Sequence, residues 1–335
     1  MGPRARARGR QGPRQGIAQP SPRRGGRGAH LGLILDVVTF AVSFAVAAAL
    51  YPIAIRFLKQ AGSGQVIQAE LPESHQKKAG TPTGGGILFV ALALVGGLVA
   101  TIAGHAGALP ALAGLALGGV IGFVDDISKL RRGSIGIPAR LKLPIQLVLA
   151  IPVAWIALDG QSLWWLPLAV VAVAAAGNAV NITDGIDGLA AGLSIIAVGA
   201  TVLLLPGAPA GEKAVAMTLC GALAGFLVFN RYPARVFMGD TGSLAIGFAL
   251  AAMAIQQGWI LLLPLVGLVF VLETLSVIIQ VAYFKASGGR RVFKMAPIHY
   301  TFHHEGWSER RIALSFWTAG LLGALAAFGV ARLVS

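Results

Sequence analysis

Five aspartates lie where long apolar segments meet short polar ones, in a chain that has only 13 acidic residues. They are Asp125, Asp126, Asp184, Asp187 and Asp240. A charge close to hydrocarbon is costly, so a chain that gathers its few carboxylates at segment ends is expected to use them together. Grouped carboxylates can bind a divalent cation and, through it, the phosphates of a substrate. We therefore expect an enzyme whose aspartates handle a metal ion and phosphates at a membrane surface.

Asp125 and Asp126 end one apolar segment, and Lys129 follows about one helical turn later. Neighbouring residues on a helix point about 100° apart, so the two carboxylates are not expected to chelate one ion from the same side. One carboxylate could approach a metal while the other faces a second partner. Lys129 could pair with either carboxylate or bind a phosphate. The alternative is a charge cluster that stabilises the end of a helix near the membrane.

A second polar set, formed by Asn178, Asn181, Asp184 and Asp187, repeats at every third position. Residues three apart are neighbours on a helix surface, so the set predicts a polar stripe at the end of a helix. Two glycines among them are expected to break the helix and to let a ligand approach the backbone. Amides and carboxylates can hydrogen-bond to a sugar, a base or metal-bound water. A capping role would explain one aspartate but not four residues in register.

Asp240 stands between two glycines in the segment from Phe237 to Ser243, just before an apolar run. N-capping of the following helix is the structural alternative for an aspartate in this position. Free backbone amides at the start of a helix can also bind phosphate. Together with the other two clusters, Asp240 is predicted to be a Mg²⁺ ligand. Phe237 and Asn230 are close enough in sequence to add stacking and an amide.

Two further polar segments are candidates for phosphate binding. Lys78 and Thr81 precede three glycines at the start of an apolar run, a composition that suits a phosphate-facing turn. His299, His303 and His304 share one polar loop. No cysteine supports a zinc site there, so phosphate binding or proton transfer is expected of these histidines.

The elements that must position these residues are apolar helices. The chain is 56% hydrophobic and 12% charged, and its mean hydropathy of +0.76 is typical of an integral membrane protein. Continuous apolar runs without two-residue alternation favour helices over a β-barrel. The predicted fold class is all-α, a polytopic integral membrane protein with about ten transmembrane helices. The runs are Leu31–Phe57, Gly84–Gly104, Leu109–Val124, Leu143–Leu158, Leu163–Val180, Leu189–Leu205, Ala214–Phe229, Ser243–Gln257, Trp259–Phe284 and Ile312–Leu333.

Lysine and arginine indicate which side of a membrane each loop faces. After residue 30 there are 19 of them, and 17 lie in loops that follow the odd-numbered runs. Only Lys213 and Arg332 fall on the other side. The odd loops are therefore predicted to be cytoplasmic, and the five aspartates map to the same face.

Residues 1–30 carry eight arginines with glycine, proline and glutamine, and are predicted to be a disordered, low-complexity arm. Residues 31–335 are predicted to form one transmembrane domain. The arm does not resemble a signal peptide, because no short apolar core with a cleavage site follows it. The net charge of +14 indicates loops that face anionic membrane lipid rather than nucleic-acid binding. The single Cys220 excludes an intramolecular disulfide.

Two features inside the apolar runs carry their own predictions. Gly114, Gly118 and Gly122 form a ladder with four-residue spacing, which predicts a close approach between helices. The alternative is that the ladder forms the face of a homodimer. Glu273 lies near the middle of a run and is expected to be protonated and hydrogen-bonded to another helix.

Together these segments resemble the phospho-N-acetylmuramoyl-pentapeptide transferase family, within the polyprenyl-phosphate N-acetylhexosamine-1-phosphate transferase superfamily. The matching stretches, spread over residues 31–335, are SHQKKAGTPTGGG, GFVDDISKL, NAVNITDGIDGLA, VFMGDTGSLAIG, FVLETLSVIIQV, KMAPIH and GWSERRI. The resemblance implies ten transmembrane helices, both termini outside, and an active site at the cytoplasmic face of the bacterial inner membrane. It implies that phospho-N-acetylmuramoyl-pentapeptide passes from UDP (the donor UDP-MurNAc-pentapeptide) to undecaprenyl phosphate. The products would be lipid I and UMP. The cofactor would be Mg²⁺.

By motif position, Asp240 resembles the metal-binding aspartate of the family, with Asn181 as the second expected metal contact. Asp125 and Asp126 resemble the pair that activates or positions the lipid phosphate. His299 resembles the first histidine of the family's loop, and it is expected to be catalytic together with the three aspartates. The substrate-binding residues implied are Lys78, Thr81, Lys129, Asn178, Asn181, Asp184, Asp187, Asn230 and Phe237.

The chain departs from the family pattern where three consecutive histidines are usual, because the run here is His299, Tyr300 and Thr301. Two other functions are left open by the residues alone. A sibling transferase would move N-acetylglucosamine-1-phosphate to a polyprenyl phosphate, and competition between the two UDP-sugars would separate it. A transporter would place ionisable groups near the middle of the membrane at interrupted helices, whereas only Glu273 is central here.

Overall fold

The computed structural model describes residues 25–64, 80–132 and 136–334. Within these ranges the chain is helical, and its only β-type contact is an isolated bridge between Gly64 and Pro82. The all-α class predicted from composition is confirmed. The chain divides into two units, Met1–Leu35 and Asp36–Ser335, and the site lies in the second. Residues 1–24 of the arm predicted over residues 1–30 lie outside the described residues, where the predicted disorder stays a prediction, and residues 25–30 belong to the first helix.

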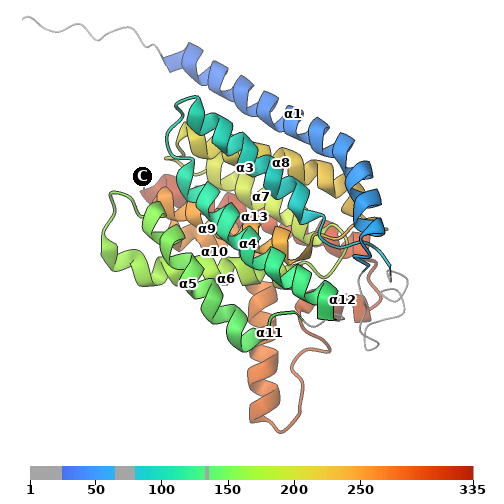
Figure 1. The fold of residues 1–335 in the computed structure, drawn as a ribbon. Coiled ribbons are helices and arrows are strands. Elements are labelled where there is room, and N and C mark those ends of the chain that lie inside the picture. The colour runs from blue at the N-terminus through green and yellow to red at the C-terminus, as the bar shows by residue number, and fades with distance from the viewer. Residues whose placement is uncertain (1–24, 65–79, 133–135, 335) are drawn as a thin grey trace, which may run out of the picture. The chain divides into compact units, whose positions relative to one another are not determined.

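The helices of the described ranges follow one another in the order drawn in Figure 1. They are α1 (Gly25–Gln60), α3 (Gly86–Ile102), α4 (Leu109–Arg132), α5 (Ala139–Ala157), α6 (Leu166–Thr183), α7 (Leu189–Leu203), α8 (Ala210–Asn230), α9 (Gly239–Gln256), α10 (Leu263–Val266), α11 (Leu268–Ala286), α12 (Ile298–His304) and α13 (Glu309–Val334). The 3₁₀ turns η1 (Leu163–Trp165) and η2 (Ile260–Leu262) precede α6 and α10.

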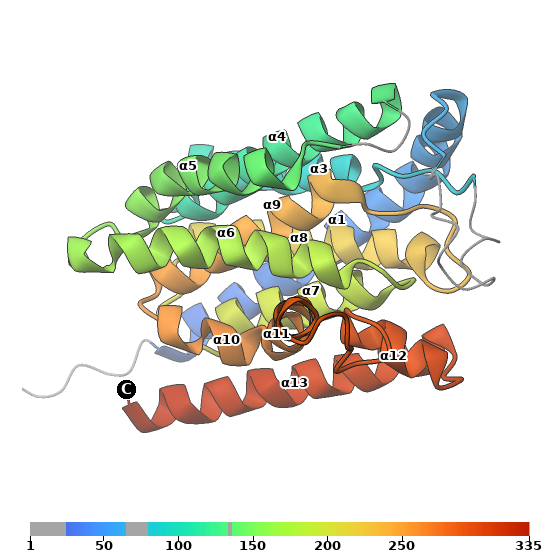
Figure 2. The ribbon, with the colours of Figure 1, turned by 90° about the horizontal axis from the view of Figure 1, so that it is seen from below.

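In the described part of the chain, 7 helices are long and apolar enough to cross a membrane, and α3 and α7 are shorter apolar helices. A polytopic membrane protein is confirmed, whereas the count of ten spans is not. The run Trp259–Phe284, predicted as one helix, is divided among η2, α10 and α11. Pro264 lacks an N–H and suits the first turn of a new helix, and Gly267 separates α10 from α11. Figure 2 views α11 almost end-on while α6 and α13 appear along their length.

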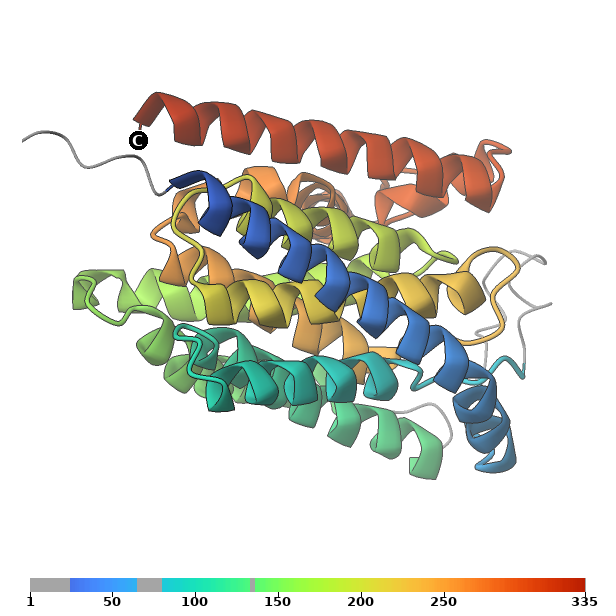
Figure 3. The ribbon, with the colours of Figure 1, turned by 90° about the horizontal axis from the view of Figure 1, so that it is seen from above.

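Helix α9 lies in the core, and every residue from Asp240 to Ile255 is buried. Its sequence is rich in glycine, alanine and other apolar residues, so neighbouring helices can approach it from all sides. Helices α3, α4, α5 and α6 pack against it, and α13 packs along α7 (Figure 3). Because Asp240 lies in the first turn of α9, this packing brings the ends of several helices close to one aspartate.

The glycine ladder of α4 makes the closest of these contacts. A Cβ atom at Gly114 would lie 2.8 Å from the backbone of Ala249, and one at Gly118 would lie 2.6 Å from the carbonyl oxygen of Leu244. At Gly122 it would overlap the backbone of the first turn of α9. The prediction of a close helix approach is confirmed. The alternative of a dimer face is wrong for this ladder, because α9 of the same chain covers it.

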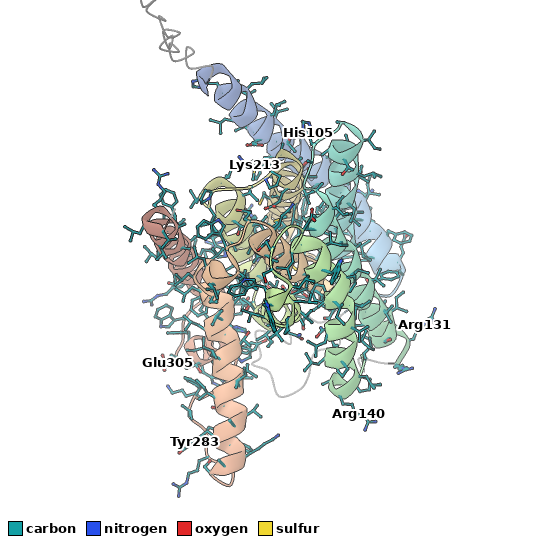
Figure 4. The ribbon with its side chains drawn as sticks, turned by 90° about the vertical axis from the view of Figure 1, so that its left-hand side faces the viewer. His105, Arg131, Arg140, Lys213, Tyr283 and Glu305 are labelled. Atoms are coloured by element: carbon teal, nitrogen blue, oxygen red, sulfur yellow. The ribbon has the colours of Figure 1, made fainter. Side chains whose placement is uncertain are left out.

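Charged residues separate to two ends of the second unit. Figure 4 shows Arg131 and Arg140 at one end, the basic end, together with Glu305, while His105 and Lys213 lie at the opposite end. Arg131, Arg140 and Glu305 were all predicted to lie on one face, and they lie at one end of the unit. Asp125 and Asp126 lie two turns or less before Arg131 on α4, so they belong to the basic end.

Candidate active site at the basic end

Asp240 is the centre of a polar cluster to which four helices contribute. Its Oδ1 accepts hydrogen bonds from the Lys129 Nζ at 2.7 Å and from the Asn181 Nδ2 at 3.0 Å. Lys142, at the start of α5, donates to Oδ2. Asn181 also donates to the Ser243 Oγ at 2.9 Å, one turn further along α9. Residues far apart in the sequence are thus joined at one carboxylate.

Asp125 shares both lysines with Asp240. Its Oδ2 lies 2.8 Å from the Lys129 Nζ and 3.4 Å from the Lys142 Nζ. Its Oδ1 accepts the backbone N–H of Ile137, just before α5, at 2.7 Å. Two buried carboxylates are therefore balanced by two ammonium groups, as buried charges require. A substrate phosphate can compete for the lysines, and a divalent cation can compete for the carboxylates.

Asp126 contacts the backbone of α9 instead of the lysines. Its Oδ1 accepts the N–H of Asp240 at 2.9 Å, and its Oδ2 accepts the N–H of Thr241 at 3.0 Å and the Thr241 hydroxyl at 2.6 Å. Because adjacent side chains on a helix point about 100° apart, Asp125 faces the charged cluster while Asp126 caps α9. The geometry gives Asp126 a positioning role towards Asp240.

Replacement Asp126→Ala is expected to lower the melting temperature, because three hydrogen bonds to the start of α9 are lost. Loss of an N-cap side chain costs about 1–2 kcal/mol, and the buried N–H groups left unpaired add to it. Thermal unfolding of the detergent-solubilised protein measures the change, with the exposed Asp159→Ala as the matched control. A melting temperature equal to that of the control would contradict the capping role.

The predicted helix break after the polar stripe is confirmed. Helix α6 ends at Thr183, and Gly188, with a φ of 75°, precedes α7. The first two members of the stripe lie on α6, while Asp184 and Asp187 lie on the α6–α7 turn. The Asp187 Oδ2 accepts the N–H of Ala234 at 2.8 Å, so the turn is tied to the segment that precedes α9.

Asp184, on the α6–α7 turn, has neighbours that favour its protonated form. Burial raises the pKa of Asp184 well above its ordinary value, and the charges of Asp240 and Asp126 raise that pKa further. Asp184 therefore holds its proton at a higher pH than an exposed aspartate does.

Asn230, the last residue of α8, braces this turn with both ends of its amide. Its Oδ1 accepts the N–H of Gly188 at 3.1 Å, and its Nδ2 donates to the carbonyl of Val236 at 2.9 Å. It is buried. The contacts place Asn230 as a support of the predicted substrate pocket.

Phe237 and Thr81 lie on neighbouring segments. The N–H of Phe237 donates to the carbonyl of Pro82 at 2.8 Å, and the N–H of Gly85 donates to the carbonyl of Phe237 at 2.9 Å. These bonds bring the chain around Thr81 beside the start of α9. Lys78, predicted to bind substrate with Thr81, lies outside the described residues.

Asn178 lies deeper in the bundle than Asn181, and its partner is another amide. Its Nδ2 donates to the Gln146 Oε1 at 2.6 Å and to the carbonyl of Ala174 at 2.8 Å. Asn178, predicted to bind substrate, is thus hydrogen-bonded to Gln146 and links α6 to α5.

His299 is fully buried and faces Glu273 of α11, with 3.0 Å between the His299 Nδ1 and the Glu273 Oε2. The expected interhelical hydrogen bond of Glu273 is confirmed. The other ring nitrogen faces the α6–α7 turn, since a Cβ atom at Gly185 would lie 2.5 Å from the His299 Nε2. His299 therefore lies between Glu273 and the α6–α7 turn, and its predicted catalytic role requires it to contact substrate at that turn.

Tyr300 and Thr301, which follow His299 directly, stabilise the loop that carries it. The Tyr300 hydroxyl donates to the carbonyl of Gly185 at 3.4 Å, and its ring packs against His299. Burial raises the pKa of Tyr300 to about 12, with a smaller contribution from nearby carboxylates. The Thr301 hydroxyl donates to the carbonyl of Met295 at 2.5 Å.

The described residues contain no group of three or more His, Cys, Asp and Glu side chains that forms a ready metal site. Mg²⁺ commonly takes only one or two carboxylates from a protein and completes its shell with water and substrate phosphates. The Asn181 Nδ2 donates to the Asp240 Oδ1, and Asp125 shares the two lysine partners of Asp240. The carboxylates of Asp240 and Asp125 supply the oxygen ligands that Mg²⁺ takes, whereas Asn181 presents its amide nitrogen to Asp240 and would have to turn its oxygen towards the ion.

Sequence reasoning missed several residues of the site. The charge pattern places Lys142 in a loop and gives it no role in the site, although Lys142 and Gln146 are four apart at the start of an apolar run. Thr241 follows Asp240 directly and could have been named as part of the same cap. Glu309, within the stretch GWSERRI, accepts the N–H of Asp187 at 3.3 Å. Nothing in the sequence pairs Glu309 with that turn.

Comparison with known proteins gives consistent matches. A model of glycosyl transferase family 4 matches residues 108–258, which include the charged cluster but not His299. Phospho-N-acetylmuramoyl-pentapeptide-transferase from Halalkalibacterium halodurans is 43% identical over 300 residues, 83% of this chain and 92% of that protein. The enzymes of that name from Shouchella clausii and Bacillus thuringiensis are 46% and 44% identical, over 83% and 85% of this chain and 92% and 93% of the relatives.

Proposed function

Because this chain belongs to the phospho-N-acetylmuramoyl-pentapeptide-transferase family, we propose that its aspartate–lysine cluster transfers a sugar phosphate from UDP-MurNAc-pentapeptide to undecaprenyl phosphate. The chain is a phosphoglycosyl transferase of the membrane, and lipid I and UMP are its products. The observation that carries the chemical assignment is the convergence of Asp125, Lys129, Lys142 and Asn181 on Asp240. A site for two anionic reactants needs cations that can leave one carboxylate partner for a phosphate.

The reaction brings two phosphates together, so charge neutralisation and positioning supply most of the catalysis. In this proposal Lys129 and Lys142 hold phosphate oxygens. Asp125 takes the last proton from the lipid phosphate, and little basicity is needed because a phosphate monoester is already nucleophilic. An oxygen of the lipid phosphate forms a bond to the sugar-linked phosphorus, and the bond from that phosphorus to UMP breaks. Attack is direct, without a phosphorylated aspartate.

Asp240 and Asn181 would hold the Mg²⁺ ion, whose chemistry is to neutralise the pyrophosphate and ease the departure of UMP. The residues of the α6–α7 turn, Asp184 and Asp187, would face the nucleotide together with Phe237. The site is proposed to open to the cytoplasm, because lysine and arginine gather in the loops of the same end.

The direct test is UMP release by the purified protein from UDP-MurNAc-pentapeptide and undecaprenyl phosphate. The expected result is release that needs both substrates and Mg²⁺, stops with EDTA and returns when Mg²⁺ is added in excess. UDP-N-acetylglucosamine in competition is expected to leave the rate unchanged. Preferred use of that sugar would instead assign the chain to the sibling reaction, and a phosphorylated enzyme trapped with the nucleotide alone would contradict direct attack.

A further inference from the structure

A buried side-chain amide about one helical turn beyond Lys142 on α5 has an NH₂ group without a hydrogen-bond partner among the described residues. Gln146 of α5 is fully buried, and its Oε1 accepts the Asn178 Nδ2 at 2.6 Å. The same Asn178 nitrogen donates to the carbonyl of Ala174 at 2.8 Å. A carbonyl can only accept, so this bond fixes which end of the Asn178 amide is nitrogen. The oxygen of Gln146 must therefore face Asn178, and its NH₂ group points elsewhere.

The Gln146 Nε2 has no hydrogen-bond partner among the described residues. A buried donor without a partner is costly, and such groups in native proteins need an explanation. Ligand binding supplies one, because the ligand provides the missing acceptor. The acceptor must reach a position inside the helix bundle.

Gln146 is connected to the charged cluster through two neighbouring helices, α5 and α6, which pack side by side (Figure 2). On α5 it follows Lys142, which bonds to both Asp125 and Asp240, by four residues, or about one turn of 5.4 Å. On α6 its partner Asn178 precedes Asn181 by three residues. Since α5 begins and α6 ends at the basic end, Gln146 lies on the membrane-interior side of the cluster.

We propose that Gln146 binds the phosphate of the polyprenyl phosphate, with its Nε2 donating to one phosphate oxygen while the Lys142 Nζ holds another. The inference rests on the proposed function and names a residue for one of its two substrates. The nucleotide side of the site is the α6–α7 turn at the basic end. The lipid substrate brings its phosphate from the membrane, and Gln146 lies on the membrane-interior side. A neutral amide in that place donates to the anion without adding a charge to the apolar bundle.

The test measures two Michaelis constants in the UMP-release assay, one for undecaprenyl phosphate and one for UDP-MurNAc-pentapeptide. Gln146→Leu is expected to raise the KM for the lipid about tenfold and to leave the KM for the nucleotide within about twofold, since one hydrogen bond to a charged group is lost. Gln146→Glu keeps the size and the oxygen that Asn178 needs, but sets a carboxylate against the phosphate. It is expected to raise the KM for the lipid further.

The matched control is Gln161→Leu, which removes an amide whose nitrogen already donates to the carbonyl of Ile255 at 2.7 Å, away from the cluster. Both constants are expected to stay unchanged in this variant. If Gln146→Leu does not fold, Gln146→Glu carries the test alone. A rise of both constants together, or of neither, in an active wild-type background would show that Gln146 holds Asn178 or a water molecule only. A wild-type protein that releases no UMP would instead overturn the proposed function.

Discussion

Replacement Asp240→Asn is expected to reduce the rate of UMP formation by about 10³-fold or more while the fold is preserved. Its carboxylate is the common partner of Lys129, Lys142 and Asn181, so the variant removes the charge around which the site is arranged. Removing a single preorganised electrostatic contact in an active site commonly costs about 10²–10³-fold, and Asp240 makes several. The rate is measured with both substrates at saturating concentration.

The fold of Asp240→Asn is expected to survive because the cap of α9 does not use the Asp240 side chain. Asp126 bonds to the backbone N–H of Asp240, which asparagine retains. The matched control is Asp159→Asn, an exposed aspartate after α5, for which wild-type activity is expected. An Asp240→Asn protein that keeps a tenth of the wild-type rate would contradict the central place given to this carboxylate.

Replacement Gly122→Ala is expected to be the most damaging change outside the charged side chains. The added methyl group would overlap the backbone carbonyl of Asp240, so α4 and α9 must move apart at the level of the site. Overpacking of a tight contact costs about 1–3 kcal/mol, and here the displaced atoms carry Asp125 and Asp240. We expect a lower melting temperature together with a loss of activity of more than about 100-fold, because misplacement by about 1 Å costs catalysis heavily.

Gly119→Ala is the matched control, since it adds the same methyl group to the same helix. The nearest atom to that methyl group would be a Val90 side-chain carbon at 3.5 Å, an ordinary van der Waals contact. Alanine also favours a helix more than glycine does. The control is therefore expected to be as stable and as active as the wild type. Equal behaviour of the two variants would refute the tight α4–α9 contact.

The sequence predicted best where one physical requirement decides the outcome. Continuous apolar runs in a chain with few charges predict membrane helices, and the structure is all-α. The four-residue glycine ladder predicts a close helix contact, and Gly122 makes it with the first turn of α9. The run Trp259–Phe284 was read as one helix because hydropathy does not register a change of direction. Pro264 and Gly267 mark where the direction changes.

Partners within the site were harder to predict because they depend on which helices are neighbours. The charge pattern places Lys142 at the basic end but does not say that α5 returns along α4 and α9 to meet Asp240. Adjacent aspartates must diverge by about 100°, yet sequence alone does not say that Asp126 caps α9 while Asp125 meets the lysines. Asn230 has the residue type of a ligand-binding group, but its amide is used to brace the α6–α7 turn.

The most direct measurement of the central claim is a double-mutant cycle of UMP formation with Asp125→Asn, Lys142→Met and the two combined. Groups that act as one unit give strongly non-additive effects, because the second change removes little once the first has disabled the unit. The combined variant is predicted to be about as active as the weaker single variant. If its loss equals the product of the two single losses, Asp125 and Lys142 act independently, and a single charged centre beside Asp240 is contradicted.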